Sequence, residues 1–566
     1  MHETVVANLS LNPRSSSGKQ MQNESHRQQH LPCLPPELWI LILRYATCSA
    51  CTNHDEYSPA VSFLSLSHSQ IHLQHRLTYY RAAMRRKALM TLVCKAWYTY
   101  AQEILFEFVW ISRASEARLL AAVLASTSSS SGKYIRRLHI ETPSLERCDP
   151  ADLRTILDCA PRLVVYSDYR SIRRSFHLDS AYSDPRASPK QLLSALAHPN
   201  NSLRRLSWTN YDDVSFHLHM SPMLETTAAN LEFLELNFCS SHLHSMFPSA
   251  ISSLSKCPIP DTPNISLTLP ALRSLKVTLD NATFAVLSTW SMPALQNLSV
   301  VSADFSYASS GFSEFFLVHG PKLTQLELGH SSSSIEEHYL TAPAPNASGS
   351  TSPGIPLAAW CPNLVEFICS ADAEWNWQHP DWIAPHVLLP THPTLQLIGI
   401  RDIDKRLRDD FPSHHVDSEE PFFMLLQQIG SLLQRDAFPA LRYIRDLSWE
   451  SDLMRRGGGL GLGLGVGAST ASVASRPPRF GLGRLFRRRV SDAAGGDAGL
   501  GMVPARAVVS AETRQVLRFW RCVLERCRDG GVWLEDLRGV NVTLSNLMRA
   551  EAGKGVATCG SGWEGW

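Results

Sequence analysis

The sequence predicts an α + α/β fold, in which a helical unit near the N-terminus precedes an irregular solenoid of short α/β repeats. Three observations support this fold class. Two strongly apolar segments with helical spacing lie between residues 31 and 112. A short unit, Leu-x-x-Leu-x-apolar, then recurs between residues 135 and 444. In many copies, proline stands two positions before the first leucine.

Length and composition limit the possible classes of protein. The chain has 566 residues, so two or more structural units are expected. Its 44% hydrophobic and 19% charged residues are typical of globular proteins, and the formal net charge is +1. This balance gives no reason to expect a nucleic acid or a membrane as partner. The 13 cysteines form no dense framework, and no signal peptide or membrane span is recognised, which predicts reduced thiols in a cytoplasmic and/or nuclear protein.

The first ordered unit is expected over residues 31–112, after a polar, disordered tail at 1–30. Pro35-Pro36-Glu37 opens a helix, because proline fits the first turn and Glu37 complements the helix dipole. The following run Leu38–Leu43 is apolar nearly all round. Such a helix is expected to be buried on more than one side.

The second half of this unit is predicted to be another helix. Apolar side chains step by three and four residues from Leu89 to Phe108, which is the spacing of an amphipathic helix. Between the two helices, residues of about 48–84 are rich in Ser, His, Thr and Tyr. They predict an irregular insertion.

Residues 113–455 are predicted to form the solenoid. Leu203 and Leu231 are 28 residues apart, and Leu272 and Leu295 are 23 apart, which lies within the range of leucine-rich repeats. Longer intervals indicate insertions. The second apolar residue of each unit and the residue two beyond it are expected to alternate inward on a short strand. These pairs are Leu138/Ile140, Leu206/Trp208, Leu234/Leu236, Leu275/Val277, Leu298/Val300, Leu326/Leu328, Phe367/Cys369 and Ile398/Ile400, with weaker copies at Tyr166 and Ile444.

Proline stands two positions before the first leucine in six of these units, at Pro270, Pro293, Pro321, Pro362, Pro393 and Pro439. It ends the preceding helix and favours an extended segment after it. One unit cannot bury its own apolar face, but stacked units can, and they leave an exposed inner surface.

The C-terminal part is predicted in three pieces. Residues 456–505 are a low-complexity linker rich in Gly and Arg. Residues 506–545 are expected to cap the solenoid with a helix at Thr513–Arg528 and an extended segment at Val532–Leu534. The tail at 546–566 is expected to be frayed.

The N-terminal unit resembles an F-box. Leu34-Pro35-Pro36-Glu37-Leu38-Trp39 matches the family's Leu-Pro-x-Glu helix start, and Leu92-Val93-Cys94-Lys95-Ala96-Trp97 matches its later Val-Cys-basic-x-Trp helix. Together with the repeats and the ending Arg528–Leu537, the chain is similar to the large fungal family of F-box proteins with degenerate leucine-rich repeats.

The resemblance implies a substrate-receptor subunit of a cullin-based, SCF-type ubiquitin ligase, which is not itself an enzyme. The F-box would bind a Skp-type adaptor, and through it a cullin, while the repeats would present an unknown protein substrate. The residues that the resemblance assigns to adaptor contact are Leu34, Pro35, Leu38, Ile42, Val93, Cys94, Trp97 and Leu105. No catalytic residue, cofactor or metal is expected.

Two alternatives stay open. In the first, the chain is a ligase-independent interaction scaffold, and the two helices either cap the N-terminal end of the solenoid or bind something other than the adaptor. The long stretch between the F-box halves also departs from the compact family pattern. It is expected to loop out, because insertions in surface loops cost little.

A candidate substrate-binding loop contains Trp375, Trp377 and Trp382 among polar residues. Exposed aromatic side chains on a loop are common binding hot spots. The alternative is that the three rings fold back and cover the edge of the solenoid.

Other motifs predict little chemistry. Cys48 and Cys51 form a lone Cys-x-x-Cys without the four ligands of a zinc site. The Gly457–Gly467 run lacks the flanking strand and helix of a dinucleotide loop. Arg476–Arg489 holds six arginines and no acid, and either is a solvated linker or serves anion binding, nuclear import or phosphorylation at Ser491.

Overall fold

The computed structural model describes most of the predicted elements. The described residues are 34–47, 62–65, 70–126, 130–143, 146–169, 171–172, 185–196, 202–210, 224, 227–238, 267–278, 281–302, 310–330, 357–371, 392–410, 422–455 and 511–551. The predicted tail at 1–30, the linker at 456–505 and the tail beyond residue 551 lie outside these ranges, as do Cys48 and Cys51.

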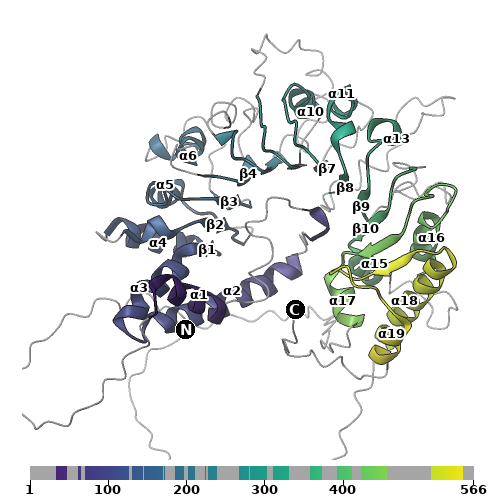
Figure 1. Ribbon diagram of the computed structural model, residues 1–566, viewed down its shortest axis with the longest axis horizontal. Helices are drawn as coiled ribbons and strands as arrows, with labels where there is room; N and C mark the ends of the chain where they lie inside the picture. The colour runs from purple at the N-terminus through teal and green to yellow at the C-terminus, as the bar shows by residue number, and fades with distance from the viewer. Residues whose placement is uncertain are drawn as a thin grey trace, which may run out of the picture.

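A twelve-stranded parallel sheet forms the body of the described structure, and its strands follow one another in chain order. Figure 1 shows the sheet bent into an arc, with strands on the inside and helices on the outside. The strands are β1 (Phe108–Ile111), β2 (Arg137–Ile140), β3 (Val165–Asp168), β4 (Arg205–Asn210), β5 (Phe233–Phe238), β6 (Ser274–Thr278), β7 (Asn297–Ser302), β8 (Gln325–His330), β9 (Glu366–Ser370), β10 (Leu397–Arg401), β11 (Tyr443–Asp446) and β12 (Trp533–Glu535).

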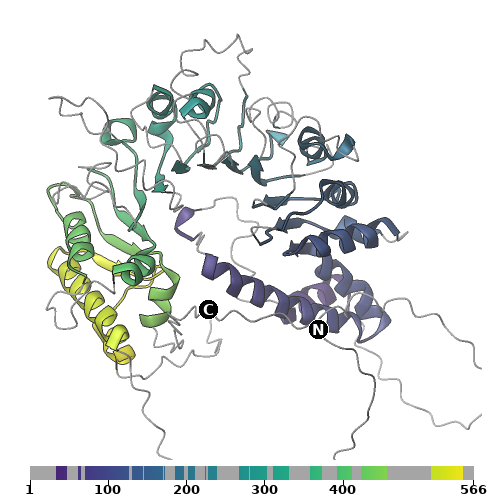
Figure 2. The ribbon, with the colours of Figure 1, turned by 180° about the vertical axis from the view of Figure 1, so that it is seen from behind.

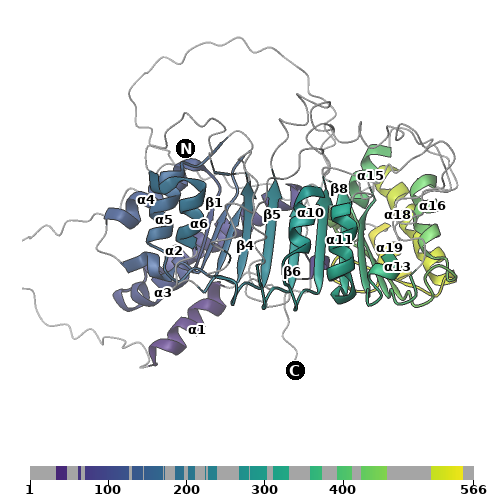
Figure 3. The ribbon, with the colours of Figure 1, turned by 90° about the horizontal axis from the view of Figure 1, so that it is seen from above.

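Most of the helices cover the outer face of the sheet (Figures 1 and 3). Neighbouring helices pack on each other, as Phe284 of α10 does on Phe315 of α11, with ring centroids 5.5 Å apart. After the N-terminal unit come α4 (Ala114–Ser126), α5 (Pro150–Asp158), α6 (Pro189–Leu196), α10 (Asn281–Ser288), α11 (Ser310–His319), α13 (Leu357–Trp360), α15 (Ile403–Asp410), α16 (Phe423–Leu432), α17 (Trp449–Arg455), α18 (Ala511–Asp529) and α19 (Leu544–Glu551). Short 3-10 turns are η1 (Phe63–Ser65), η2 (Ser130–Tyr134), η3 (Pro185–Ala187) and η4 (Gly320–Lys322).

The recurring apolar pairs lie where the sequence predicts them. Leu275 of β6 is in register with Leu298 of β7, and Val277 with Val300. All four are fully buried in one continuous core between sheet and helices. Because side chains alternate along a strand, the residues between them point to the inner face. The prediction of stacked strands sharing one core is therefore confirmed.

The N-terminal boundary of the sheet differs from the prediction. Phe108–Ile111 forms β1 and pairs with β2 in parallel, so the array begins inside the predicted N-terminal unit, 31–112, rather than after it. The predicted helix over Leu89–Phe108 is also wrong in its continuity. It divides at Leu92–Cys94 into α2 (Gln70–Thr91) and α3 (Lys95–Glu107). Helical spacing is the same in both pieces, so periodicity alone did not reveal the break.

Helix α2 corrects part of the prediction of an irregular insertion over about 48–84, because residues 70–84 are helical, while residues 48–61 and 66–69 lie outside the described residues. Its Tyr80 packs on Phe108 and Trp110 of β1, and Leu77 and Met84 pack against the same cluster. Tyr80 Oη accepts a hydrogen bond from the Trp110 backbone N–H at 2.9 Å. This contact satisfies a polar group on the exposed edge of the first strand, which would otherwise invite pairing with another chain.

The C-terminal cap matches its prediction and extends beyond it. Helix α18 buries Phe519 and Trp520, as its apolar spacing predicts, and β12 pairs with β11. Arg455 of α17 lies 4.3 Å from the Trp520 ring and forms an ion pair with buried Asp446, which joins the cap to the array. The expectation of a frayed tail from residue 546 is wrong up to residue 551, because α19 continues to Glu551 and buries Leu547.

His319 at the end of α11 carries a pH-dependent contribution to stability. Its ring is fully buried and packs on Phe315 at 4.8 Å between centroids. The Nδ1 atom lies 3.2 Å from Lys322 Nζ. Burial, and secondly the charge of Lys322, lower the pKa of His319 from 6.5 to about 4.

Between pH 7 and pH 5 the free energy of unfolding is expected to fall by about 2 kcal/mol through His319. In this window the unfolded chain binds a proton at the imidazole while the folded chain does not, so stability decreases as pH falls. Denaturant titrations of the wild type and His319→Gln at both pH values measure the effect. The variant is expected to lose less stability over this interval. An equal pH dependence in both proteins would contradict the assignment.

Candidate protein interaction surface

Helix α1 (Pro36–Thr47) is held by one side. Pro36 occupies its first turn, where a missing N–H is tolerated, and the Leu38 N–H bonds the Pro35 carbonyl at 3.0 Å. Leu43 is buried against α3, with Ala101 and Ile104. Arg44 adds ion pairs to α3, to Glu103 and Glu107 at 3.2 Å each.

The other side of α1 is apolar and exposed. Leu38, Leu41, Ile42 and Tyr45 follow the i, i+3, i+4, i+7 spacing of one helix face, and each is more than 40% exposed. The prediction that this helix is buried on more than one side is therefore not met by the described residues of this chain. Figure 3 shows α1 beside α3 at the outer end of the molecule, away from the sheet.

A second exposed apolar group lies where α2 meets α3. Leu89, Leu92 and Val93 are 61–72% exposed. The turn is fixed by Cys94, whose sulfur accepts a hydrogen bond from the Trp97 backbone N–H at 3.4 Å and caps α3. We call the two groups together the N-terminal apolar surface: Leu38, Leu41, Ile42 and Tyr45 of α1, Leu89 of α2, and Leu92 and Val93 of the α2–α3 turn.

The adaptor-contact residues predicted from the sequence fall into two sets. Pro35, Leu38, Ile42 and Val93 are exposed. The other four, Leu34, Cys94, Trp97 and Leu105, are half-buried.

Trp97 shows why the second set is partly covered. Its ring packs on Trp39 at 5.8 Å between centroids, and it also contacts the small core between α1 and α3. This ring therefore has an internal role besides any contact with a partner.

The sequence interpretation missed part of this surface. The predicted adaptor-contact residues do not include Leu41 and Tyr45, although their spacing from Leu38 marks the same helix face, nor the exposed Leu89 and Leu92. The candidate substrate-binding residues Trp375, Trp377 and Trp382 lie outside the described residues, so the structure does not place them.

Basic residues flank the apolar surface. Arg85 and Arg86 of α2 and Lys95 at the start of α3 are exposed beside the α2–α3 turn. A partner that covers this surface is expected to be acidic at its rim, because complementary charge speeds encounter and fixes orientation.

Two buried thiols of the described chain are held in their neutral form. Burial raises the pKa of the Cys361 and Cys527 thiols to about 12, so neither is a nucleophile at neutral pH. No group of three or more His, Cys, Asp and Glu side chains suited to a metal ion occurs in the described ranges. In the same part of the chain, no helix has the length and apolar character needed to cross a membrane.

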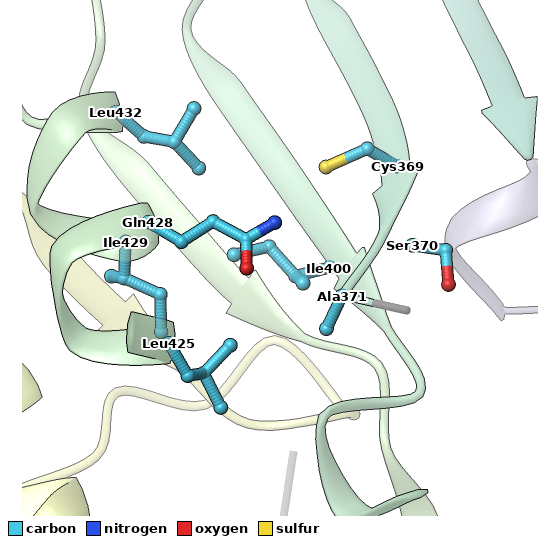
Figure 4. Close-up of a pocket in the computed structure, with 8 residues that line it drawn as sticks. All are labelled: Cys369, Ser370, Ala371, Ile400, Leu425, Gln428, Ile429 and Leu432. Atoms are coloured by element: carbon cyan, nitrogen blue, oxygen red, sulfur yellow. The ribbon is translucent and has the colours of Figure 1, made fainter. Parts of the chain in front are cut away.

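A small cavity lies between α16 and the strands β9 and β10 (Figure 4). Its volume is about 10 Å³, which is the space of a single water molecule. Leu425, Ile429 and Leu432 of α16 line one side, and Cys369 and Ile400 line the other. A cavity of this size admits no organic substrate.

Comparisons with known proteins add little to this geometry. No protein-family model and no curated protein matches the chain. Among solved structures, the chain is similar to a protein from Bacteroides fragilis, with 12% identity and a TM-score of 0.23. That match covers 66% of this chain and 79% of the other.

Proposed function

We propose that this chain is a substrate-receptor subunit of a cullin-based ubiquitin ligase, with an F-box at its N-terminus and degenerate leucine-rich repeats in its arc. The observation that carries the proposal is the N-terminal apolar surface. Leu38, Ile42 and Val93, which the F-box resemblance assigns to adaptor contact, are exposed on it. Contiguous exposed apolar groups of this kind mark protein-binding sites.

A Skp-type adaptor is the partner that this surface would bind. Each square ångström of apolar surface removed from water contributes roughly 25 cal/mol, so the exposed leucines of α1 and of the α2–α3 turn supply a substantial driving force. The helix-face arrangement of Leu38, Leu41, Ile42 and Tyr45 suits packing against helices of another protein.

The role in ubiquitin transfer is one of proximity rather than chemistry. The receptor would hold a protein substrate near a ubiquitin-charged enzyme, which raises the effective concentration of the reacting groups. Such a receptor acts in the cytoplasm or the nucleus.

The test is direct binding of the full-length chain to a purified Skp-type adaptor by isothermal titration calorimetry. The full chain is used because β1 pairs with β2, so a fragment ending near residue 112 would lose that neighbour. We expect an equimolar complex with a negative heat-capacity change, which is the mark of apolar burial. Addition of the cullin is expected to give a ternary complex.

The second candidate function is a ligase-independent interaction scaffold. The observation that favours it is the contact of Tyr80 with the backbone of β1, because it gives the N-terminal unit a capping role inside the fold. The same titration separates the two functions. A folded full-length chain that fails to bind the adaptor would replace the ligase proposal with the scaffold.

A further inference from the structure

A short segment of the N-terminal region lies inside the arc, against the inner face of the sheet. Residues 62–65, which include the turn η1, are seated beside strands β9 and β10 in both views of the molecule (Figures 1 and 2). In sequence, this segment is more than 260 residues from the strand residue Gln325 that binds its backbone.

The apolar side chains of the segment fill a pocket made by inward-facing residues. Phe63 and Leu64 are buried, and they pack with Phe233 of β5, Ile368 of β9, Leu397 of β10 and Leu447, which follows β11. These strand positions alternate with the residues of the main core, so this cluster is separate from it.

A glycine forms the floor of the pocket. A Cβ atom added at Gly399 of β10 would lie 3.0 Å from Leu64 Cδ2 and 2.9 Å from Leu447 Cδ1. The missing side chain at this strand position therefore provides the space that Leu64 occupies.

Two strand side chains bind the backbone of Phe63. Gln325 of β8 accepts a hydrogen bond from the Phe63 N–H at 2.7 Å, and its amide donates to Ser62 Oγ at 2.8 Å. Arg401 of β10 donates to the Phe63 carbonyl at 2.5 Å. Glu327 of β8 forms an ion pair with Arg401 and orients its guanidinium.

The pocket thus contacts three consecutive residues of a turned segment. It bonds a small hydroxyl side chain, the N–H and carbonyl of the next residue, and it buries an aromatic and then an aliphatic side chain. These contacts come from side chains of the sheet and from Leu447 just after β11, and they do not depend on the bound peptide belonging to the same chain.

We propose that this inner-face pocket binds a segment of a partner protein. Ser62-Phe63-Leu64 of the chain itself occupies the same pocket when no partner is bound. The ligand is a partner protein with an exposed segment of the pattern small hydroxyl, aromatic, aliphatic. Where the chain acts as a ligase receptor, which rests on the function proposed above, this segment is the recognition element of the substrate. A substrate must then displace the internal copy, whose effective concentration is on the order of millimolar.

The experiment uses full-length proteins and a fluorescent peptide with the sequence of residues 58–68 of this chain. Phe63→Ala/Leu64→Ala removes the internal side chains and opens the pocket. We expect this variant to bind the peptide at least tenfold more tightly than the wild type, in a fluorescence-anisotropy titration. Adding Gly399→Val to it fills the floor of the pocket and is expected to abolish binding. A peptide with alanine in place of both apolar residues is the matched ligand control.

Two results of the peptide titration would contradict the proposal. A folded Phe63→Ala/Leu64→Ala variant that does not bind the peptide, or binding that survives Gly399→Val, would overturn the proposal. If the double variant does not fold, the milder Leu64→Ala variant is titrated instead, and an affinity no higher than that of the wild type would show that the segment is a structural strap. The assay contains no adaptor, so its outcome is independent of the adaptor titration.

Discussion

Ile42→Asp is expected to weaken binding of the full-length chain to a Skp-type adaptor by about 100-fold, or roughly 3 kcal/mol. Ile42 is 43% exposed in the middle of the apolar face of α1, between Leu38 and Tyr45. A partner that covers this face would have to desolvate the carboxylate without a compensating charge, and the central residues of an interface carry most of its binding energy. Biolayer interferometry of both proteins against the immobilised adaptor measures the change.

The matched control is Leu317→Asp. Leu317 is 64% exposed on α11, outside the N-terminal apolar surface, and receives the same carboxylate. It is expected to leave adaptor affinity unchanged. Because both sites are exposed, neither substitution should shift the unfolding midpoint by much. Equal affinities for the two variants would remove α1 from the adaptor interface.

Phe367→Ala is expected to lower the free energy of unfolding by about 3–5 kcal/mol. Phe367 is fully buried on β9, in register with Leu326 of β8 and Ile398 of β10. Its removal leaves a cavity near the middle of the array. In a linear array each layer is stabilised by its neighbours, so this loss is also expected to uncouple the two halves and to broaden the transition. Chemical denaturation followed by circular dichroism measures both effects.

Phe423→Ala provides the control with the same change of side chain. Phe423 begins α16 and is 47% exposed, so its truncation is expected to cost less than about 1 kcal/mol. If the two variants differ in free energy of unfolding by less than about 1 kcal/mol, β9 does not anchor the array.

The repeating unit is where the sequence was most informative. Leu275 and Val277, and the equivalent pairs of the other units, are buried. The sequence predicted this because a period of two within a strand, with a proline before it, is compatible with few other structures. Periodicity also predicted the buried face of α18. The i, i+3, i+4, i+7 spacing of Leu38, Leu41, Ile42 and Tyr45 likewise places these four residues on one face of α1.

The errors fall where one local pattern is compatible with two structures. Phe108 continues the helical spacing of α3, yet it begins β1, because pairing with Arg137 of β2 decides its conformation. The apolar residues of helix α2 are spread around the helix and do not mark one face. That Leu77, Tyr80 and Met84 form a packing face is evident only from their contacts with the strand β1. Such long-range contacts override local propensity.

By itself, the sequence determined the stacked strands, their shared core and the apolar character of α1, because these depend on spacing between neighbours in the chain. Only the tertiary structure decided where the array begins and that Phe63 and Leu64 lie on its inner face. Their pocket is assembled from Phe233, Gln325 and Arg401, on three different strands. No local pattern specifies such a site, because its residues meet only when the sheet curves and brings distant segments together.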